Sequence, residues 1–395
     1  MFKRAYFQII TDRLDKKRRF IQVIMGPRQV GKTTTVKQVL EETSKPFLFF
    51  SADLIPSSQN SWITDCWDNA RAQLKFNQWN EIILVIDEIQ KINNWIEAVK
   101  KEWDFDSFHD INIKVILLGS SRVMLEKGLS ESLAGRFEAI KMTHWNFSEM
   151  QEAFDLSLDQ YIYFGGYPGA ADLIHNELRW KEYILSSIID ATINKDILMN
   201  SVINKPALLR QTFELASSYS GEIVSLTKLI GSLQDAGNTT TLSGYLNLLS
   251  ECGLLCGLPK LCGDQSRMRA SIPKFQVFNN ALKTVYVDLK FDEAVRNSKV
   301  WGRIFESAIG AHIACNTFTS GYQAYYWREN NQEVDYIIKS GSKITAIEVK
   351  SNHDSASKGL TLFREKFNPQ SALIVGFGGF PPDQFLSQNP IKVIS

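Results

Sequence analysis

The sequence predicts an α/β fold, with a helix-covered parallel sheet in its N-terminal part, and three patterns lead to this class. An apolar run over residues 20–25 is followed by a glycine-rich loop and a helical pattern. A continuous apolar run over residues 82–86 ends in two carboxylates, which is typical of a central parallel strand. Near the C-terminus, a helical pattern over residues 301–313 precedes three strand patterns between residues 325 and 350.

Length and composition limit the classes of protein that the chain can form. With 395 residues, and roughly 100–200 residues per domain, two or three domains are expected. The chain is 44% hydrophobic and 22% charged, which favours a folded core. A net charge of +1 provides no global basic field, so any nucleic-acid contact requires a local patch. No apolar stretch is long enough for a membrane span or a signal peptide. We therefore expect a cytoplasmic protein with reduced cysteines.

The glycine-rich loop has the form G-x-x-x-x-G-K-T and lies between a strand and a helix from Thr35 to about residue 42. Such glycines turn backbone amides toward phosphate oxygens, and the helix adds the positive end of its dipole. We expect Lys32 to reach the β and γ phosphates of ATP and Thr33 to offer its hydroxyl to Mg²⁺. The alternative is a chance glycine turn before a basic helix. The predicted nucleotide-binding residues of this loop are Gly26, Pro27, Arg28, Gln29, Val30, Gly31, Lys32, Thr33 and Thr34.

The carboxylates after the second apolar run supply the other half of an ATPase site. Ligands bind at the carboxyl ends of parallel strands, which places Asp87 to hold Mg²⁺ through its water shell. Glu88 can orient or deprotonate the attacking water, and this pair of acids indicates hydrolysis rather than nucleotide binding alone. The alternative is a strand that ends in a solvated acidic turn.

Two later positions are candidates for the same site. A strand pattern over residues 114–119 leads to Ser120, which could sense the γ-phosphate or simply form a strand-end turn. Arg136 follows a Leu-Ala-Gly sequence and could stabilise transition-state charge, in the same subunit or across an interface. Taken alone, such an arginine is more often a surface residue.

The middle of the chain has the rhythm of a winged helix. After a glycine- and proline-rich connector within residues 160–172, helical patterns over 207–218, 226–234 and 240–251 precede a strand pattern over 254–261. The last helix carries no lysine or arginine. Phosphate contacts would therefore come from the basic residues around it, and the alternative is a helical packing or dimerisation module. Those basic residues are Lys228, Lys260, Arg267 and Arg269.

The C-terminal strands follow the order of a PD-(D/E)xK nuclease core. Glu348 and Lys350 lie two residues apart on one strand, so their side chains leave the same face, and Asp335 lies on the neighbouring strand. Glu306, on the preceding helix, could join Asp335 and Glu348 in holding Mg²⁺ or Mn²⁺, while Lys350 steadies an attacking water. The alternatives are a surface Glu-Lys ion pair on an edge strand, or a nuclease-like fold that has lost its activity.

The chain resembles prokaryotic AAA-type ATPases that carry a C-terminal domain of unknown function with a nuclease-like fold. The resemblance covers residues 21–351 and rests on GPRQVGKTT, ILVIDEIQKI, ILLGSS, SLAGRFEAIKMTHWNFSEM, YFGGYP, EVDYII and AIEVKS. The order of the later motifs is more specific than the phosphate loop, which many ATPases share. The resemblance implies an AAA module in which Arg136 is the module's arginine and in which a homo-oligomer could complete each site.

Together these patterns predict three domains and a leading function. We expect an AAA-type P-loop ATPase over residues 1–155, a helical and winged-helix segment over 156–265, and a nuclease-like domain over 270–395. The leading hypothesis is ATP hydrolysis coupled to DNA handling, with metal-dependent cleavage left open. The alternative is an ATP-switched binding or signalling protein with an inactive nuclease-like domain. The expected partners are ATP, DNA and further copies of the chain, with no membrane.

Overall fold

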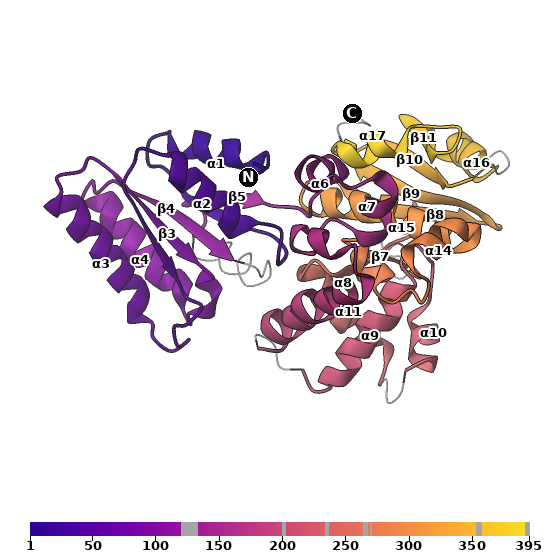
Figure 1. Cartoon of the computed structure of the whole chain (residues 1–395), viewed down its shortest axis with the longest axis horizontal. Coiled ribbons are helices and arrows are strands. Elements are labelled where there is room, and N and C mark those ends of the chain that lie inside the picture. Colours follow the sequence, from indigo (N-terminus) through magenta and orange to yellow (C-terminus); the bar gives the residue numbers. More distant parts are fainter. Residues whose placement is uncertain are drawn as a thin grey trace. The chain divides into compact units, whose positions relative to one another are not determined.

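The chain folds into two compact units in a computed structural model that describes residues 1–119, 133–199, 203–233, 237–263, 268, 271–352 and 358–391. The units are Met1–Met142 and Thr143–Ser395, referred to below as the N-terminal and C-terminal units (Figure 1). In the described part of the chain, no helix is both long enough and apolar enough to span a bilayer.

A parallel sheet forms the centre of the N-terminal unit, with strands in the order β2–β3–β4–β1–β5. Because all strands run the same way, their carboxyl ends lie at one edge of the sheet and their amino ends at the other. This confirms the parallel α/β fold expected here. The elements are α1 (Tyr6–Leu14), β1 (Ile21–Met25), α2 (Lys32–Glu42), β2 (Phe47–Ser51), α3 (Ser61–Phe76), β3 (Ile82–Asp87), η1 (Ile89–Lys91), α4 (Trp95–Phe108), β4 (Ile113–Gly119) and β5 (Phe137–Lys141).

Helices cover both faces of this sheet, which explains why its central strands are fully buried and β3 is apolar up to Asp87. Neighbouring residues on a strand point to opposite faces. Val23 and Leu84 pack in one cluster with residues of α3 and α4, whereas Ile24 and Val85 pack in another with residues of α1 and α2. Figure 1 shows these helix pairs on opposite sides of the sheet.

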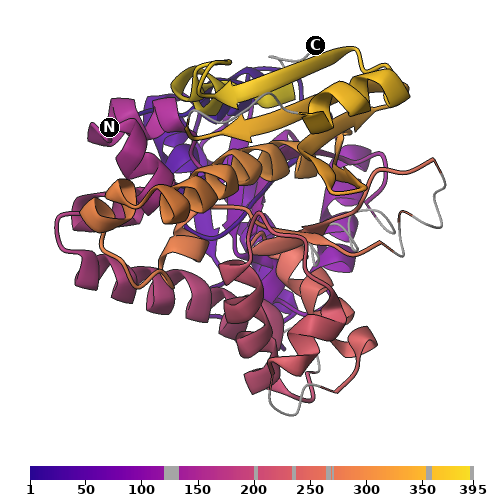
Figure 2. The same ribbon diagram turned by 90° about the vertical axis from the view of Figure 1, so that its right-hand side faces the viewer.

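The C-terminal unit contains a mixed sheet in the order β11–β10–β9–β8. Strand β9 pairs antiparallel with β8 and β10, while β10 and β11 are parallel. Helix α15 packs on one face, and Figure 2 shows it lying along the sheet. Helix α16 covers the other face through Phe363 and Leu360. These elements are α15 (Ser298–Phe318), β8 (Gln323–Glu329), β9 (Gln332–Ser340), β10 (Lys343–Lys350), α16 (Lys358–Phe367), β11 (Ser371–Gly376) and α17 (Pro382–Ser387).

The rest of this unit is mainly helical and includes a two-stranded sheet in which β6 pairs antiparallel with β7. Helices lie where three were predicted in the middle of the chain, and a strand follows them. The winged-helix interpretation stays a prediction, and part of its predicted turn falls outside the described residues. These elements are α6 (Phe147–Phe154), α7 (Leu158–Phe164), η2 (Pro168–Leu173), α8 (Glu177–Tyr183), the π-helical segments η3 (Ile184–Asp190) and η4 (Thr192–Leu198), α9 (Pro206–Ser218), α10 (Leu226–Gly231), α11 (Thr239–Glu251), β6 (Leu255–Leu258), β7 (Lys274–Val277), α13 (Ala281–Thr284) and α14 (Phe291–Arg296).

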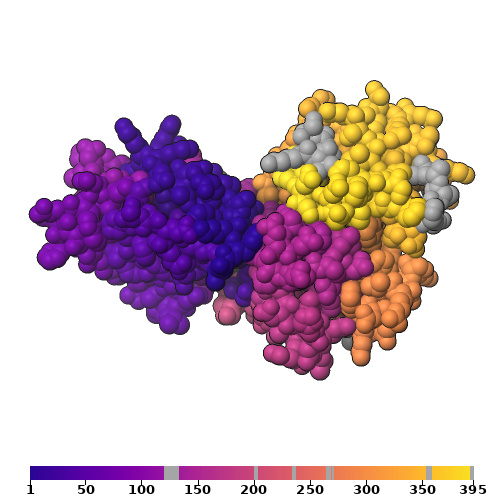
Figure 3. All heavy atoms as spheres, turned by 45° about the horizontal axis from the view of Figure 1, so that its top comes forward, coloured from indigo at the N-terminus to yellow at the C-terminus, as the bar shows by residue number. Residues whose placement is uncertain are grey.

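One hydrophobic core joins the helical part of this unit to the C-terminal sheet. Phe213 and Leu249 from the helices belong to the same cluster as Ile309 and Ile347 from α15 and β10. The two ends of the unit also meet, since Asn146 Nδ2 donates to the carbonyl of Ser387 at 3.2 Å. In Figure 3 the yellow C-terminal atoms lie directly against the magenta atoms of the early helices. The three predicted domains stay a prediction, but the predicted middle and C-terminal segments share this core.

Candidate functional site: a nucleotide loop and a second polar cluster

The predicted phosphate loop lies between β1 and α2, at the carboxyl edge of the parallel sheet. Gly31 immediately precedes α2 and has a φ of 89°, a conformation that glycine adopts without strain. Gly26 is required for another reason, because a Cβ there would lie 2.4 Å from the carbonyl oxygen of Met142. The remainder of the loop is held by Arg4, whose Nη1 donates to the carbonyl of Val30 at 3.1 Å. Nothing in the sequence pattern singled out Arg4.

The structure brings together the two residues expected to hold magnesium in the N-terminal unit. Thr33 Oγ1, at the start of α2, donates to Asp87 Oδ2 at the end of β3, with 2.8 Å between them. The sheet order explains this proximity, since only β4 separates β1 from β3 and both strands end at the same edge. A hydroxyl beside a carboxylate is an oxygen donor set that suits Mg²⁺.

Lys32 lies at the base of the loop and is largely buried, with 7% of its surface exposed. Its Nζ donates to the carbonyls of Gly26 and Pro27, at 2.9 and 2.8 Å. A buried ammonium needs such partners, and phosphate oxygens would be stronger ones. The geometry thus holds the lysine at the loop that it is expected to serve.

Glu88 occupies a backbone conformation that is costly for a glutamate. Its φ of 53° and ψ of 35° fall in the left-handed region, and strain of this kind collects at functional sites. The backbone amide of Glu88 donates to Asp87 Oδ1 at 2.9 Å, and Gln90 Nε2 donates to Glu88 Oε2 at 2.6 Å. Gln90 is therefore a further candidate for orienting this carboxylate. Sequence reasoning did not select it, although its place two residues after Glu88 was visible.

Arg136 does not lie beside the phosphate loop of its own chain. Its carbonyl accepts from Ile21 at the first residue of β1, which is the amino edge of the sheet. A strand of this length separates the two edges by roughly 15 Å. The guanidinium instead donates two hydrogen bonds to the carboxylate of Asp104 on α4, with Nε–Oδ1 and Nη2–Oδ2 distances of 2.7 and 3.0 Å. The other candidate for the γ-phosphate, Ser120, lies outside the described residues.

The C-terminal candidates form a second polar cluster on α15, β9 and β10. Asp335 Oδ2 accepts from the backbone amide of Val349 at 2.7 Å, which ties β9 to β10. Lys350 Nζ lies 3.1 Å from Glu348 Oε1, so the two residues of the Glu-x-Lys motif form an ion pair with each other.

A lysine that the sequence analysis did not select lies among these carboxylates. Lys274, on β7, is fully buried. Its Nζ donates to Glu306 Oε1 at 2.7 Å and to Glu333 Oε1 at 3.3 Å, and it lies 3.8 Å from Asp335 Oδ1. Among the described residues, no group of three or more histidine, cysteine or acidic side chains is arranged to hold a metal ion. The metal role of Glu306, Asp335 and Glu348 stays a prediction.

Burial and crowding of like charges shift the protonation of this cluster. Burial raises the pKa of Asp335 well above its usual value, and Glu306 adds to the rise while Lys274 opposes it. For Lys274, burial lowers the pKa, but Glu306, Tyr336 and the other acids raise it well above the ordinary range. The raised pKa favours the charged ammonium of Lys274, which offsets part of the negative charge around it.

The fold and the phosphate loop define the N-terminal unit as a domain of the P-loop class. Comparison with known families shows which kinds of domain the chain resembles. Residues 18–151 match the family model described as an AAA domain. Residues 155–293 match a domain of unknown function, DUF8612, and residues 301–385 match another, DUF4143. The AAA and DUF4143 matches confirm these two parts of the resemblance.

Similar proteins are known from bacteria and archaea. A Haemophilus influenzae protein described as uncharacterized is 22% identical over 385 residues, which cover 90% of this chain and 89% of the relative. An uncharacterized Methanocaldococcus jannaschii protein is 24% identical over 344 residues, covering 82% and 73%.

Solved structures with some likeness include the Aeropyrum pernix ORC2 protein and AMPPCP-bound DnaA from Aquifex aeolicus. ORC2 has a TM-score of 0.44 and 14% identity, covering 76% of this chain and 92% of that one. DnaA has a TM-score of 0.32 and 16% identity, covering 62% and 86%. Likenesses of this degree carry no weight for function.

Proposed function

We propose that the N-terminal unit binds ATP with Mg²⁺ and hydrolyses it. The observation that carries this proposal is the hydrogen bond between Thr33 and Asp87, next to the phosphate loop. It joins the hydroxyl and the carboxylate that a magnesium–nucleotide complex requires, and both come from elements that the sheet order brings to one edge. The match of residues 18–151 to an AAA domain supports the same class of activity.

Each residue of the site has a distinct role in this proposal. The loop amides and Lys32 bind the phosphates, and Lys32 exchanges its carbonyl partners for phosphate oxygens. Thr33 and Asp87 would hold Mg²⁺, whose charge offsets that of the phosphates. Glu88, oriented by Gln90, takes the proton of the attacking water.

Nucleotide affinity tests the phosphate-binding part of the proposal. Lys32→Ala removes charge-assisted hydrogen bonds, so the Kd for Mg-ATP should rise by about 10-fold or more. Lys37→Ala is a matched control, because Lys37 is an exposed lysine on the same helix. Titration with a fluorescent ATP analogue measures both variants, and equal affinities would contradict a phosphate clamp at Lys32.

We propose that ATP hydrolysis is coupled to the handling of DNA. Support comes from the C-terminal unit, where Glu306 on a helix and Asp335 and Glu348 on neighbouring strands follow the order of a nuclease core. ATP hydrolysis should therefore rise when DNA is added. Rates measured with single-stranded DNA, duplex DNA and RNA test this, and a rate indifferent to all three would contradict coupling.

A second candidate is an ATP-switched binding protein whose nuclease-like domain does not cut, and Lys274 favours it. An ammonium placed among the acids already supplies positive charge that a metal ion would provide. Product lengths on a gel, with Mn²⁺ and ATP present, separate the two candidates. Cleavage that disappears in both Asp335→Ala and Lys350→Ala would establish a nuclease, whereas intact DNA and RNA with wild type would establish the binding protein.

A further inference from the structure

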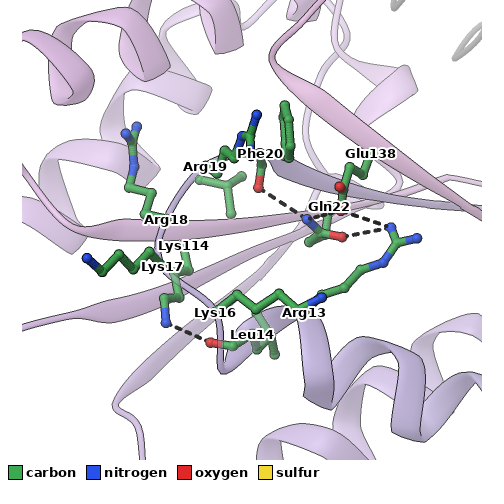
Figure 4. Close-up of a pocket in the computed structure, with 11 residues that line it drawn as sticks. Arg13, Leu14, Lys16, Lys17, Arg18, Arg19, Phe20, Gln22, Lys114 and Glu138 are labelled. Atoms are coloured by element: carbon green, nitrogen blue, oxygen red, sulfur yellow. Dashed lines mark hydrogen bonds and ion pairs between the residues drawn. The ribbon is translucent and has the colours of Figure 1, made fainter.

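A basic hollow lies at the amino edge of the N-terminal sheet, at the opposite edge from the phosphate loop. Its volume is about 580 Å³, and it is bounded by the end of α1, the segment before β1, and the first residues of β1, β4 and β5 (Figure 4). Six cationic side chains line it, whereas Glu138 is the one acid in its lining. The segment 15–20 that joins α1 to β1 contributes most of this charge.

Half of these cations have structural partners that hold the segment in place. Arg18 donates to the carbonyls of Ile113 and Trp103, at 2.9 and 3.1 Å, and its guanidinium lies 3.6 Å from the Trp103 ring centre. Lys114 donates to the carbonyl of Leu14 at 2.6 Å and so fixes the end of α1. Arg13 Nη1 donates to Gln22 Oε1 at 3.0 Å and lies 3.4 Å from Glu138 Oε2. Figure 4 shows the Arg13 side chain extending toward Gln22.

The other cations are exposed and unneutralised. Within the described ranges, the side chains of Lys16, Lys17 and Arg19 form no hydrogen bond or ion pair, and Arg19 lies 5.0 Å over the ring of Phe20. Like charges held this close repel one another, so the fold carries an electrostatic cost that an anionic ligand would relieve. Because the neighbouring residues anchor the segment, these cations are presented from a fixed backbone.

The arrangement favours one side of the segment for that ligand. A second hollow, on the other side, shares Lys16–Arg19 and Lys114 but is also lined by four acids, Asp15, Glu81, Asp106 and Asp110. These acids lower the net positive charge on that side of the segment. The first hollow, with its single acid, is therefore the better anion site.

We propose that this hollow binds the phosphate backbone of nucleic acid. The inference rests on the proposed function in one respect, namely that nucleic acid is what the ATPase handles. The three exposed cations of the hollow, Lys16, Lys17 and Arg19, can contact about three phosphates of one strand. Contacts of this kind position a strand without reading its sequence. A concave site with Phe20 inside it suits a strand better than a flat membrane surface.

The test compares two triple variants that remove the same charge. Lys16→Ala, Lys17→Ala and Arg19→Ala together remove the exposed cations of the hollow. The matched control changes Lys75, Lys299 and Lys343 to alanine, three exposed lysines elsewhere. Fluorescence anisotropy with a labelled 20-nucleotide single-stranded DNA and the same RNA, without ATP, gives the Kd at several salt concentrations. Thermal unfolding confirms that both variants fold.

Three phosphate contacts predict a specific salt dependence. For single strands, affinity should fall roughly 20-fold between 50 and 200 mM salt through these contacts. The hollow variant should lose most of this dependence, whereas the control should keep it. Equal losses of salt dependence in both variants would overturn the proposal. A protein that bound phosphatidylserine vesicles or polyglutamate, but neither oligonucleotide, would overturn it as well. Inorganic triphosphate that competes as well per phosphate as DNA would identify a free polyphosphate site instead. Because binding is measured without ATP, this inference and the proposed hydrolysis fail separately.

Discussion

Lys274 lies fully buried beside Glu306 and Asp335, two carboxylates that the sequence pattern assigned to a metal ion. A buried charge persists only when it is paired, and removing one partner of such a network costs about 3–5 kcal/mol. The ammonium and the acids therefore depend on one another. In this interpretation the cluster stabilises the junction between β7, α15 and β9.

Replacing Lys274 with methionine should reveal this dependence. Lys274→Met should lower the free energy of unfolding by about 3 kcal/mol, because its carboxylates lose their counter-charge. Added Mn²⁺ should restore part of the loss in the variant and have little effect on wild type. Chemical denaturation with and without Mn²⁺ measures both effects. If Mn²⁺ stabilised wild type at least as strongly as the variant, the acids would form a metal site despite the lysine.

His312 gives a prediction about pH. Burial lowers its pKa to about 4, while its hydrogen bonds to the carbonyls of Gln388 and Phe385 oppose the shift. The unfolded chain binds this proton near pH 6.5 and the folded protein does not, so stability falls as pH drops from 6.5 toward 4. The loss should reach about 3 kcal/mol relative to a variant that cannot titrate. Denaturation of wild type and His312→Gln at pH 7 and pH 4.5 measures the difference, and parallel losses would contradict it.

Sequence patterns selected most residues of the candidate nucleotide site because the chemistry proposed for it is concentrated in two short motifs. Lys32, Thr33, Asp87 and Glu88 are each fixed by spacing from a glycine or from the end of a strand. Lys274 could not be found in this way. Its partners come from elements far along the chain, and alternation along β7 would place a lysine on a solvated face.

At the scale of elements, β1, the phosphate loop and β5 form one tightly packed arrangement. Strand β5 runs beside β1. The backbone of Met142, the residue after β5, lies so close to Gly26 that no side chain fits between them. The loop is therefore shaped by the strand next to it as well as by its own glycines. The same crowding limits which residues can stand at position 26.

Gly26→Ala should disturb this arrangement. The added Cβ would lie 2.4 Å from a backbone oxygen, which cannot move as a flexible side chain could. We expect a loss of about 1–3 kcal/mol in stability, together with weaker nucleotide binding. Gly244→Ala is the control, since no atom lies within 4 Å of its added Cβ, and it should be neutral or slightly stabilising. Thermal unfolding of both variants tests this, and an unaffected Gly26→Ala would argue against the close approach.

Strands β1, β3 and β4 of the N-terminal sheet could be predicted because strands covered on both faces are largely apolar, whereas the less buried edge strands β2 and β5 were not predicted. The helices of the middle segment and α15 were also visible from their period. Strands β7 and β11 were not predicted. β7 carries Lys274 and Gln276 as buried polar residues, and β11 is a short strand whose pairing with β10 depends on the intervening α16. Packing between distant segments decides such cases, and no local pattern encodes it.

For the whole molecule, the position of Arg136 at the amino edge separates it from the phosphate loop of its own chain. If this arginine acts in catalysis, it must therefore reach the site of another copy. Removing a catalytic arginine of this kind costs about 10³-fold in rate or more.

Mixing two inactive variants tests such a shared site. Arg136→Ala and Lys32→Ala should each hydrolyse ATP poorly, and their mixture should regain activity, because some sites then combine an intact lysine with an intact arginine. Sedimentation with ATP should show an oligomer. A protein that stays monomeric with ATP and hydrolyses it at the full rate would contradict a site shared between two copies.

We propose ATP hydrolysis at the carboxyl edge of the N-terminal sheet and nucleic-acid binding at its amino edge. Turnover and nucleotide affinity of Glu88→Gln, measured separately against wild type and the exposed control Glu41→Gln, test the proposed hydrolysis most directly. Wild type and the control should hydrolyse ATP with Mg²⁺. Glu88→Gln should bind ATP nearly as well but turn over about 100-fold or more slowly, because the amide keeps the shape of the carboxylate and cannot accept the proton. Undiminished turnover in Glu88→Gln, or no Mg-dependent hydrolysis by wild type, would contradict the account.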